Sequence, residues 1–232
     1  MKNHRKKSGP RRLNRLEILY EDQDLLVICK EPGLLTNSYK DDRSPTAERS
    51  LTGYLRKGSS RSWIRAYTVH RLDRDTSGLL IFAKNKAIQQ KLQENWKDVE
   101  KHYTAVVHGN LDEESGKFAS YLMENKAQVV YSTADKAVGK WSETLYQVVK
   151  ETARFSLLDI TLLTGRKNQI RVHLAEAGYP IVGDAKYGKK RDRVARMALH
   201  ARTLAFPHPY DGSPMEFEAP VPKAILDLVK GV

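Results

Sequence analysis

The sequence predicts an α+β fold, with a largely antiparallel, mixed β-sheet and flanking helices and loops. Three observations support this prediction: strand-like segments outnumber helical ones, neighbouring strands are joined by tight turns, and no regular strand–helix–strand alternation is present. The 232 residues are enough for one sizeable core, and 40% hydrophobic with 29% charged residues is ordinary for a globular protein.

The first 15 residues are expected to form a disordered basic arm, followed by a single domain over residues 16–232. Seven Lys and Arg side chains, Gly9 and Pro10 precede the first acidic residue, Glu17. Such an arm either wraps phosphates or acts as a solubilising tail.

The first half of the domain is expected to contain a strand hairpin, two helices and a buried strand. Residues 16–20 and 25–30 read as strands joined by a turn at 21–24. Leu51, Tyr54 and Leu55 have helical spacing, and residues 79–84 (LLIFAK) read as a buried strand. An amphipathic helix is expected over residues 85–97.

The second half is expected to begin with an alternating strand at 101–109 that places Tyr103 and Val107 on one face. A long hairpin should follow over residues 144–164, turning near 151–154. A polar loop then leads into a helix through Ile170 and Leu174, which Gly178 should end. The rest reads as loops and short strands, with a last helix within 223–230.

The chain carries 40 basic and 28 acidic residues, a formal net charge of +12. Such a charge attracts polyanions, in binding that salt should weaken strongly. Charge alone does not show whether the polyanion is RNA, DNA or an anionic membrane surface. The alternative is a protein that is merely soluble and basic.

With Cys29 as the sole cysteine, an internal disulfide framework and a cysteine-based zinc site are excluded. Neither a membrane-spanning run nor an apolar leader is visible, so we expect a cytoplasmic protein.

Residues 69–78, VHRLDRDTSG, concentrate charge directly before the buried run LLIFA. They form either a salt-bridged turn or a reaction centre. Asp73 lies between Arg71 and Arg74, and cations beside a carboxylate hold it ionised, which suits a nucleophile or base. Thr76, Ser77 and Gly78 can make the turn rigid.

A second basic cluster, TGRKNQIR, places Arg166 and Lys167 in a loop and Arg171 near a helix start. One of them is expected to pair with the Asp73 loop. A metal-dependent nuclease with Asp73, Asp75 and Asp184 as ligands is an alternative, which the crowding arginines disfavour. A non-catalytic RNA-binding module is another. A metal-free nucleotide-modifying enzyme fits best, so no metal is predicted.

HRLDRDTSG closely resembles the signature loop of the RluA-type pseudouridine synthases, and three further blocks support the likeness. DLLVICKEPGLLT resembles the opening strand and Lys-x-Pro-Gly turn of that family. KHYTAVVHG resembles its Lys-x-Tyr-x-Ala strand. TGRKNQIRVHLAEAGYPIVGDAKYG resembles its TGR-x-x-Q-x-R helix and GD-x-x-YG loop. The four blocks keep the family's order over residues 24–188.

The resemblance implies a pseudouridine-synthase catalytic fold and a cofactor-free isomerisation of uridine to pseudouridine in RNA. Asp73 would be the catalytic carboxylate, either attacking the anomeric carbon or removing a sugar proton. Tyr103 would pack on the flipped target base and help remove its C5 proton, and Arg171 would pair with Asp73. The residues expected to bind RNA are His70, Arg71, Arg74, Arg166, Lys167 and Gln169.

Two residues depart from the family pattern. Asn168 stands where many members have His, and Glu31 lies inside the Lys-Pro turn. We expect a member without an N-terminal S4 RNA-binding domain, which recognises its RNA mainly through the catalytic domain. A ribosomal RNA stem-loop of the 23S type is favoured over transfer RNA. We also expect a monomer with no membrane association and no obligatory protein partner.

Overall fold

The structure is a computed structural model that describes residues 11–38, 44–57, 59, 61–189 and 192–230. The chain forms two compact units, each described by itself. Unit 1 comprises Met1–Val99 with Ala205–Ala219, and unit 2 comprises Glu100–Leu204 with Pro220–Val232.

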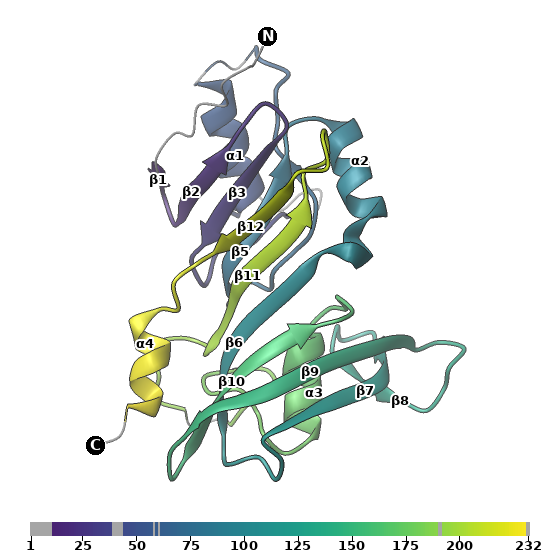
Figure 1. Ribbon diagram of the computed structural model, residues 1–232, viewed down its shortest axis with the longest axis vertical. Coiled ribbons are helices and arrows are strands. Elements are labelled where there is room, and N and C mark those ends of the chain that lie inside the picture. The colour runs from purple at the N-terminus through teal and green to yellow at the C-terminus, as the bar shows by residue number, and fades with distance from the viewer. Residues whose placement is uncertain (1–10, 39–43, 58, 60, 190–191, 231–232) are drawn as a thin grey trace. The chain divides into compact units, whose positions relative to one another are not determined.

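Unit 1 contains an antiparallel sheet in the order β1-β2-β3-β5, with β4 also paired to β5, and two helices, α1 and α2 (Figure 1). Every residue of β5 is buried, and α2 packs against this strand. The elements are β1 (Arg11–Leu13), β2 (Leu16–Glu21), β3 (Leu25–Lys30), α1 (Ala47–Arg56), β4 (Tyr67–Thr68), β5 (Ser77–Ala83), α2 (Lys86–Glu94), the 3-10 turn η1 (Trp96–Asp98) and β12 (Pro214–Glu218).

Side-chain caps explain why the unit 1 elements begin where the sequence predicts. In the hairpin turn, Asp22 Oδ1 accepts hydrogen bonds from the amides of Asp24 and Leu25, both at 2.8 Å. Asn85 caps α2 in the same way, accepting from the amide of Ile88 at 2.9 Å. The predicted hairpin, both helices and the buried strand are confirmed.

Unit 2 contains strands in the order β11-β6-β10-β9-β7-β8, and the pairs from β6 to β8 are antiparallel. Helix α3 contacts β7, β8 and β9, whose shared face it covers (Figure 1). The elements are β6 (Glu100–His108), β7 (Ser115–Glu124), β8 (Val130–Thr133), β9 (Lys140–Glu151), β10 (Phe155–Leu162), α3 (Gln169–Glu176), β11 (Leu199–Pro207, which continues into unit 1), α4 (Lys223–Leu226) and the 3-10 turn η2 (Asp227–Val229).

Helix α3 ends at the predicted glycine. Gly178 has φ +90°, the left-handed region that favours glycine, and its amide donates to Ala175. The next amide, of Tyr179, donates to Leu174 at 2.9 Å. These two bonds form a Schellman motif, which satisfies the last carbonyls of the helix. The predicted strand at 101–109 and the 144–164 hairpin are also present, as β6 and β9–β10.

Two parts of the chain differ from the sequence-based expectation. Residues 1–10 of the basic arm lie outside the described residues, but the next three form strand β1 on β2, where disorder was expected. Strands β7 and β8 were not anticipated. None of the helices in the described part of the chain has the length and apolar character needed to cross a bilayer.

Candidate functional site

The loop at residues 69–76, here called the Asp73 loop, joins β4 to β5 in unit 1. Asp73 is partly exposed, whereas Arg71 and Arg74 are exposed. The loop ends at two buried hydroxyl residues, Thr76 and Ser77, each 2% exposed. A charged loop is thus carried directly on a fully buried strand, as the sequence predicts.

The Asp73 loop is anchored by a buried lysine at the end of β3. Lys30 is 0% exposed, and its Nζ donates to the backbone oxygens of Glu31 (3.0 Å), Leu34 (2.9 Å) and Arg74 (3.0 Å). An ammonium group has three N–H donors, so all three are satisfied. The amide of Gly33 also donates to the Arg74 oxygen, at 2.7 Å. The ammonium group of Lys30 therefore holds two loops together: the loop that contains Glu31 and Leu34, and the Asp73 loop.

Further contacts fix the loop on either side of Asp73. The hydroxyl of Thr36 donates to the Leu72 oxygen at 2.9 Å and accepts from the Leu72 amide at 3.2 Å. The His70 Nε2 accepts from the amide of Ile81 at 3.1 Å, and its ring stacks on Trp96 with centroids 4.3 Å apart. Backbone groups of the loop thus have fixed partners, which suits preorganised chemistry.

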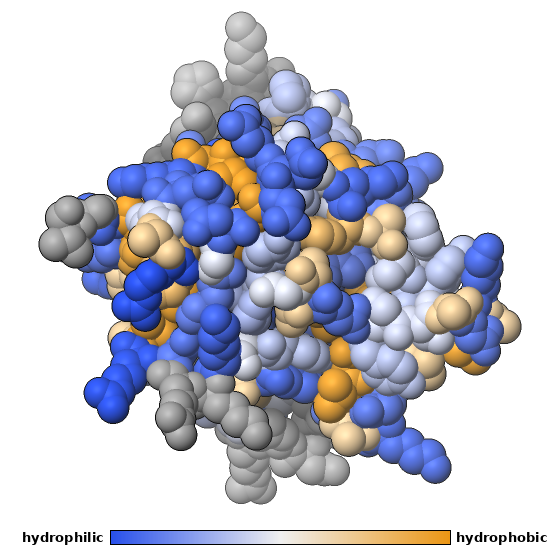
Figure 2. All heavy atoms as spheres, turned by 90° about the horizontal axis from the view of Figure 1, so that it is seen from below, coloured by the Kyte–Doolittle hydropathy of each residue, from blue (hydrophilic) through white to orange (hydrophobic). Residues whose placement is uncertain are grey.

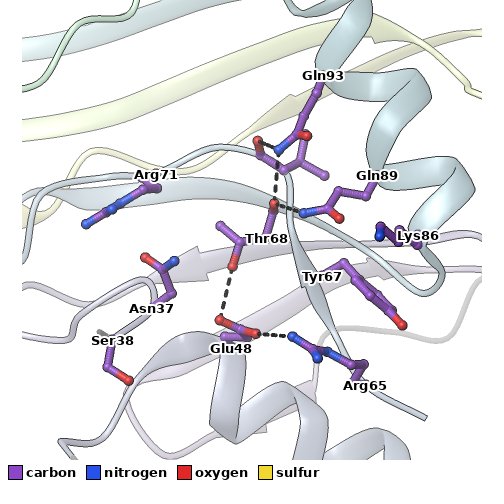
Figure 3. Close-up of a pocket in the computed structure, with 11 residues that line it drawn as sticks. Asn37, Ser38, Glu48, Arg65, Tyr67, Thr68, Arg71, Lys86, Gln89 and Gln93 are labelled. Atoms are coloured by element: carbon purple, nitrogen blue, oxygen red, sulfur yellow. Dashed lines mark hydrogen bonds and ion pairs between the residues drawn. The ribbon is translucent and has the colours of Figure 1, made fainter. Parts of the chain in front are cut away.

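The two arginines of the loop have different surroundings. Arg74 pairs with Asp75, Nε to Oδ1 at 3.1 Å, in an exposed ion pair. Arg71 lines a cavity next to the loop (Figure 3). Of the two arginines expected to flank Asp73, Arg74 thus pairs with the neighbouring Asp75, and the pairing of Asp73 with either arginine stays a prediction.

Tyr103 lies in β6 of unit 2 and is 7% exposed. Tyr103 begins a row of directly paired residues across the sheet. It is paired with Ile160 in β10, Ile160 is paired with Tyr146 in β9, and Tyr146 is paired with Gly116 in β7. Directly opposed residues share a face of a sheet. Thr144, two residues before Tyr146, accepts or donates a hydrogen bond with His173 of α3 at 3.0 Å. Tyr103 is therefore on the face that α3 covers.

Arg171 in α3 is held by a buried, bidentate ion pair with Asp184. The distances are 2.7 Å from Nε to Oδ2 and 2.8 Å from Nη2 to Oδ1, with Asp184 2% exposed. Its Nη1 donates to Asn168 Oδ1 at 3.0 Å, and the guanidinium lies 5.1 Å from the centre of the Tyr187 ring. The motif helix and the GDAKYG loop are thereby joined.

The pKa of Asp184 is lowered from its ordinary value of 3.8. Burial alone would raise the pKa, but the hydrogen bond and charge of Arg171 outweigh burial, helped by the amides of Tyr187 and Lys186. Asp184 is thus an ionised partner of an arginine. The nuclease alternative counted it among three metal ligands, and its oxygens are instead used by Arg171 and two amides.

Gln169, which was expected to contact RNA, is buried and makes hydrogen bonds within the protein. It is 2% exposed, its Oε1 accepts from the Thr164 hydroxyl (2.8 Å) and the Arg166 amide (3.0 Å), and its Nε2 donates to the Glu143 oxygen and the Thr144 hydroxyl. Both acceptor sites and both donors of the amide are used. Gln169 fixes the TGRKN loop that presents Arg166 and Lys167.

Arg166 and Lys167 are exposed at the tip of the TGRKN loop. Arg166 Nε donates to the Trp141 oxygen at 3.3 Å, and Lys167 pairs with Glu124 of β7. Both are accessible to a polyanion. The loop turns into α3 at Asn168, whose left-handed backbone (φ 55°) and hydrogen bond to the Tyr187 hydroxyl explain why a small amide fits there.

The predicted catalytic residues are divided between the units. Asp73 belongs to unit 1, whereas Tyr103 and Arg171 belong to unit 2. The pairing of Arg171 with Asp73 stays a prediction. Sequence reasoning missed Lys30, for which the Lys-x-Pro-Gly turn was the available signal.

The sequence pattern of RNA pseudouridylate synthases matches residues 24–176 of this chain. The uncharacterized RNA pseudouridine synthase YlyB of Bacillus subtilis (strain 168) is 36% identical over 221 residues, which cover 94% of this chain and 73% of that protein. The ribosomal large subunit pseudouridine synthase D of Neisseria meningitidis (serogroup A) is 35% identical over 229 residues, covering 92% and 60% of the two chains.

Two solved human structures have similar folds. The structure named RNA Pseudouridylate Synthase Domain Containing 1 has a TM-score of 0.70 at 28% identity, covering 88% of this chain and 83% of that one. RNA Pseudouridylate Synthase Domain Containing 4 has a TM-score of 0.73 at 23% identity, covering 90% of each, and is similar in fold.

Proposed function

This chain belongs to the RNA pseudouridylate synthase family and is an enzyme that isomerises uridine to pseudouridine in RNA, and we propose that Asp73 is the carboxylate with which it does so. The observation that carries this proposal is the anchoring of the Asp73 loop by Lys30 and Thr36. A fixed backbone places the carboxyl group of Asp73 without reorganisation during the reaction.

The reaction breaks the bond between uracil N1 and the ribose anomeric carbon and forms one between that carbon and C5. The base loses a proton at C5 and gains one at N1, so reactant and product have the same atoms. The redox state is unchanged and no group is transferred, which is why a carboxylate and proton-transfer groups suffice. The target base must leave its stack at a cost of a few kcal/mol.

Tyr103 is our candidate for the surface on which that base rests, and for the group that assists loss of the C5 proton. Its burial in β6 gives the ring a fixed orientation, supported by Ile160 on the neighbouring strand. Arg171 is our candidate partner for Asp73. Its ion pair with Asp184 keeps the guanidinium in one rotamer, so that it acts as a preset cation.

We propose ribosomal RNA as the substrate class. The relative from Neisseria meningitidis, 35% identical over 229 residues, is named as a ribosomal large subunit pseudouridine synthase. His70, Arg71, Arg74, Arg166 and Lys167 are the proposed RNA contacts, with Gln169 acting through the loop that it fixes. The net charge of +12 suits a phosphate-rich substrate.

The test is tritium release from RNA labelled at uridine C5, with ribosomal and transfer RNA assayed separately. Wild type should release tritium from ribosomal RNA, with or without a chelator, and Asp73→Asn should release none while melting at nearly the same temperature. Asp75→Asn is the matched control, because it removes the other carboxylate of the same loop, and it should remain active. Equal loss in both variants, or release by Asp73→Asn, would refute the assignment.

A further inference from the structure

A polar cavity of about 750 Å³ lies beside the Asp73 loop in unit 1 (Figure 3). Its volume is within the range of small-ligand pockets. Asp73 is not among the described residues that line it. The lining comes from residues 37 and 38, α1, β4 with the segment before it, the Asp73 loop and α2.

The cavity has a positive balance of charge. Arg65, Arg71 and Lys86 line it, and Glu48 is the acidic member. Glu48 is already bound, by Arg65 at 3.3 Å and by the Thr68 hydroxyl at 3.4 Å. Arg65 also lies over the Tyr67 ring, 4.9 Å from its centre. The remaining positive charge suits an anionic ligand such as an RNA backbone.

Amide groups line the cavity where a base edge would need partners. Gln89 and Gln93 extend from α2, and their Nε2 atoms donate to the backbone oxygens of Thr68 (2.7 Å) and Val69 (3.1 Å) (Figure 3). No described residue donates to either amide oxygen, so both can accept. A carbonyl and an amide are the groups with which Asn and Gln read base edges.

Asn37 supplies the sharpest observation. Its Oδ1 is buried and has no hydrogen-bond partner among the described residues. A buried polar atom without a partner is costly, and an ordered water or a bound group that donates to this oxygen would remove that cost. In Figure 3 the Asn37 amide lies on the same side of Thr68 as Glu48, across from the α2 side chains.

We propose that this cavity binds one unpaired base of the RNA substrate, separate from the uridine that reacts. Asn37, Gln89 and Gln93 would contact the base edge, and Arg65, Arg71 and Lys86 the phosphates on either side of it. Since it lies beside the Asp73 loop, the cavity would fix which uridine reaches Asp73. This inference rests on the proposed function for its substrate but makes a separate prediction about binding.

The test measures the binding of four fluorescently labelled oligoribonucleotides, each five nucleotides of A, C, G or U alone, by fluorescence anisotropy. Wild type should prefer one base, and Asn37→Asp, which keeps the shape but replaces the amide N–H donor with a negatively charged acceptor, should lower that affinity about tenfold. Gln90→Glu is the matched control, because it adds the same charge on the outward face of α2. It should lower the affinity less than twofold.

The inference is overturned if wild type binds the four oligonucleotides equally or without measurable affinity. It is also overturned if Asn37→Asp and Gln90→Glu lose affinity alike. The binding assay separates this result from a failure of the proposed function. Asp73→Asn should bind the preferred oligonucleotide as wild type does, whether or not either protein releases tritium from RNA.

Discussion

At the scale of single residues, the ion pair between Arg171 and Asp184 is the most tightly defined part of the site. Removing one partner of a buried pair leaves the other charge without compensation. Arg171→Lys would keep the charge but lose the two-pronged contact, because an ammonium group cannot match both carboxylate oxygens. The pair is thus specific for arginine on stereochemical grounds.

We predict that Asp184→Asn lowers the free energy of unfolding by about 3 kcal/mol at pH 7. The folded-state pKa of Asp184 lies below its ordinary value of 3.8, so the stabilisation is present above that pH and is lost as the pH falls through the folded pKa. The variant should therefore lose less stability than wild type below pH 4. Urea unfolding at pH 7 and at acidic pH measures both effects.

The control is Asp75→Asn, because Asp75 forms only an exposed ion pair. It should change the free energy of unfolding by about 0–1 kcal/mol. Equal effects of the two variants would contradict the prediction.

At the scale of elements, α1 holds the segment that follows it. Arg56 Nε donates to the Ile64 oxygen at 2.9 Å, and the amide of Ala66 donates to the Thr52 hydroxyl at 3.1 Å. Trp63, which directly precedes Ile64, is 95% exposed. An aromatic ring with arginines nearby in sequence, fully in solvent, suits stacking with unpaired bases.

We predict that Trp63→Ala weakens binding of single-stranded RNA by about 1–3 kcal/mol. The thermal midpoint should stay nearly unchanged, because an exposed side chain contributes little to packing. Trp63→Phe is the control, since a phenyl ring still stacks and should keep most of the affinity. Anisotropy titration with a labelled single-stranded RNA measures the effect. A drop in thermal stability without a change in affinity would assign the ring to packing instead.

The elements also show what local sequence can and cannot predict. The β2–β3 hairpin and α3 have their own signals in Asp22 and Gly178, which act within a few residues. Strand β7 has weak alternation, and its state depends on pairing with β9, where Phe118 stands opposite Thr144. Its Gly116 lies under the Tyr146 ring, where a Cβ would be 2.7 Å from the hydroxyl. Such long-range packing is invisible in a short window.

Within the candidate site, too, some residues are identified by local sequence, whereas the roles of others depend on long-range contacts. Asp73 was identifiable because its loop matches a long motif. Lysine is rarely buried, and Lys30 is favourable in the interior only because three carbonyl oxygens from two loops converge on it. Asp184 resembled a metal ligand in the sequence, whereas in the fold Arg171, thirteen residues earlier in the chain, lies beside it. Both roles arise from tertiary contacts rather than from spacing.

At the scale of the whole molecule, the net charge favours binding to RNA. The chain carries a net charge of +12, and the face in Figure 2 is mostly hydrophilic, with apolar residues in small separate groups. A surface of this kind favours polyanions over a large apolar protein interface. The logarithm of its affinity should fall linearly with the logarithm of the salt concentration.

We predict that the double variant Arg166→Gln, Lys167→Gln reduces the slope of that salt dependence by about 2, one for each phosphate that the variant no longer neutralises. Binding of ribosomal RNA across a range of potassium chloride concentrations measures the slope. The double variant Lys223→Gln, Lys230→Gln removes the same charge from two lysines outside the proposed RNA contacts, and should leave the slope nearly unchanged. Equal slopes for the two double variants would exclude Arg166 and Lys167 from the RNA path.

The burial of Lys30 also governs the chemical reactivity of this protein. An amine reacts with acylating agents through its unprotonated lone pair, and the Nζ of Lys30 is enclosed with all three of its protons donated to carbonyl oxygens. Acetylation at Lys30, by a reagent or an enzyme, therefore requires the Asp73 loop to open first. Once acetylated, the side chain would be neutral and too bulky for its former place, and the loop could not close again. Modification of this one nitrogen would therefore hold the Asp73 loop open.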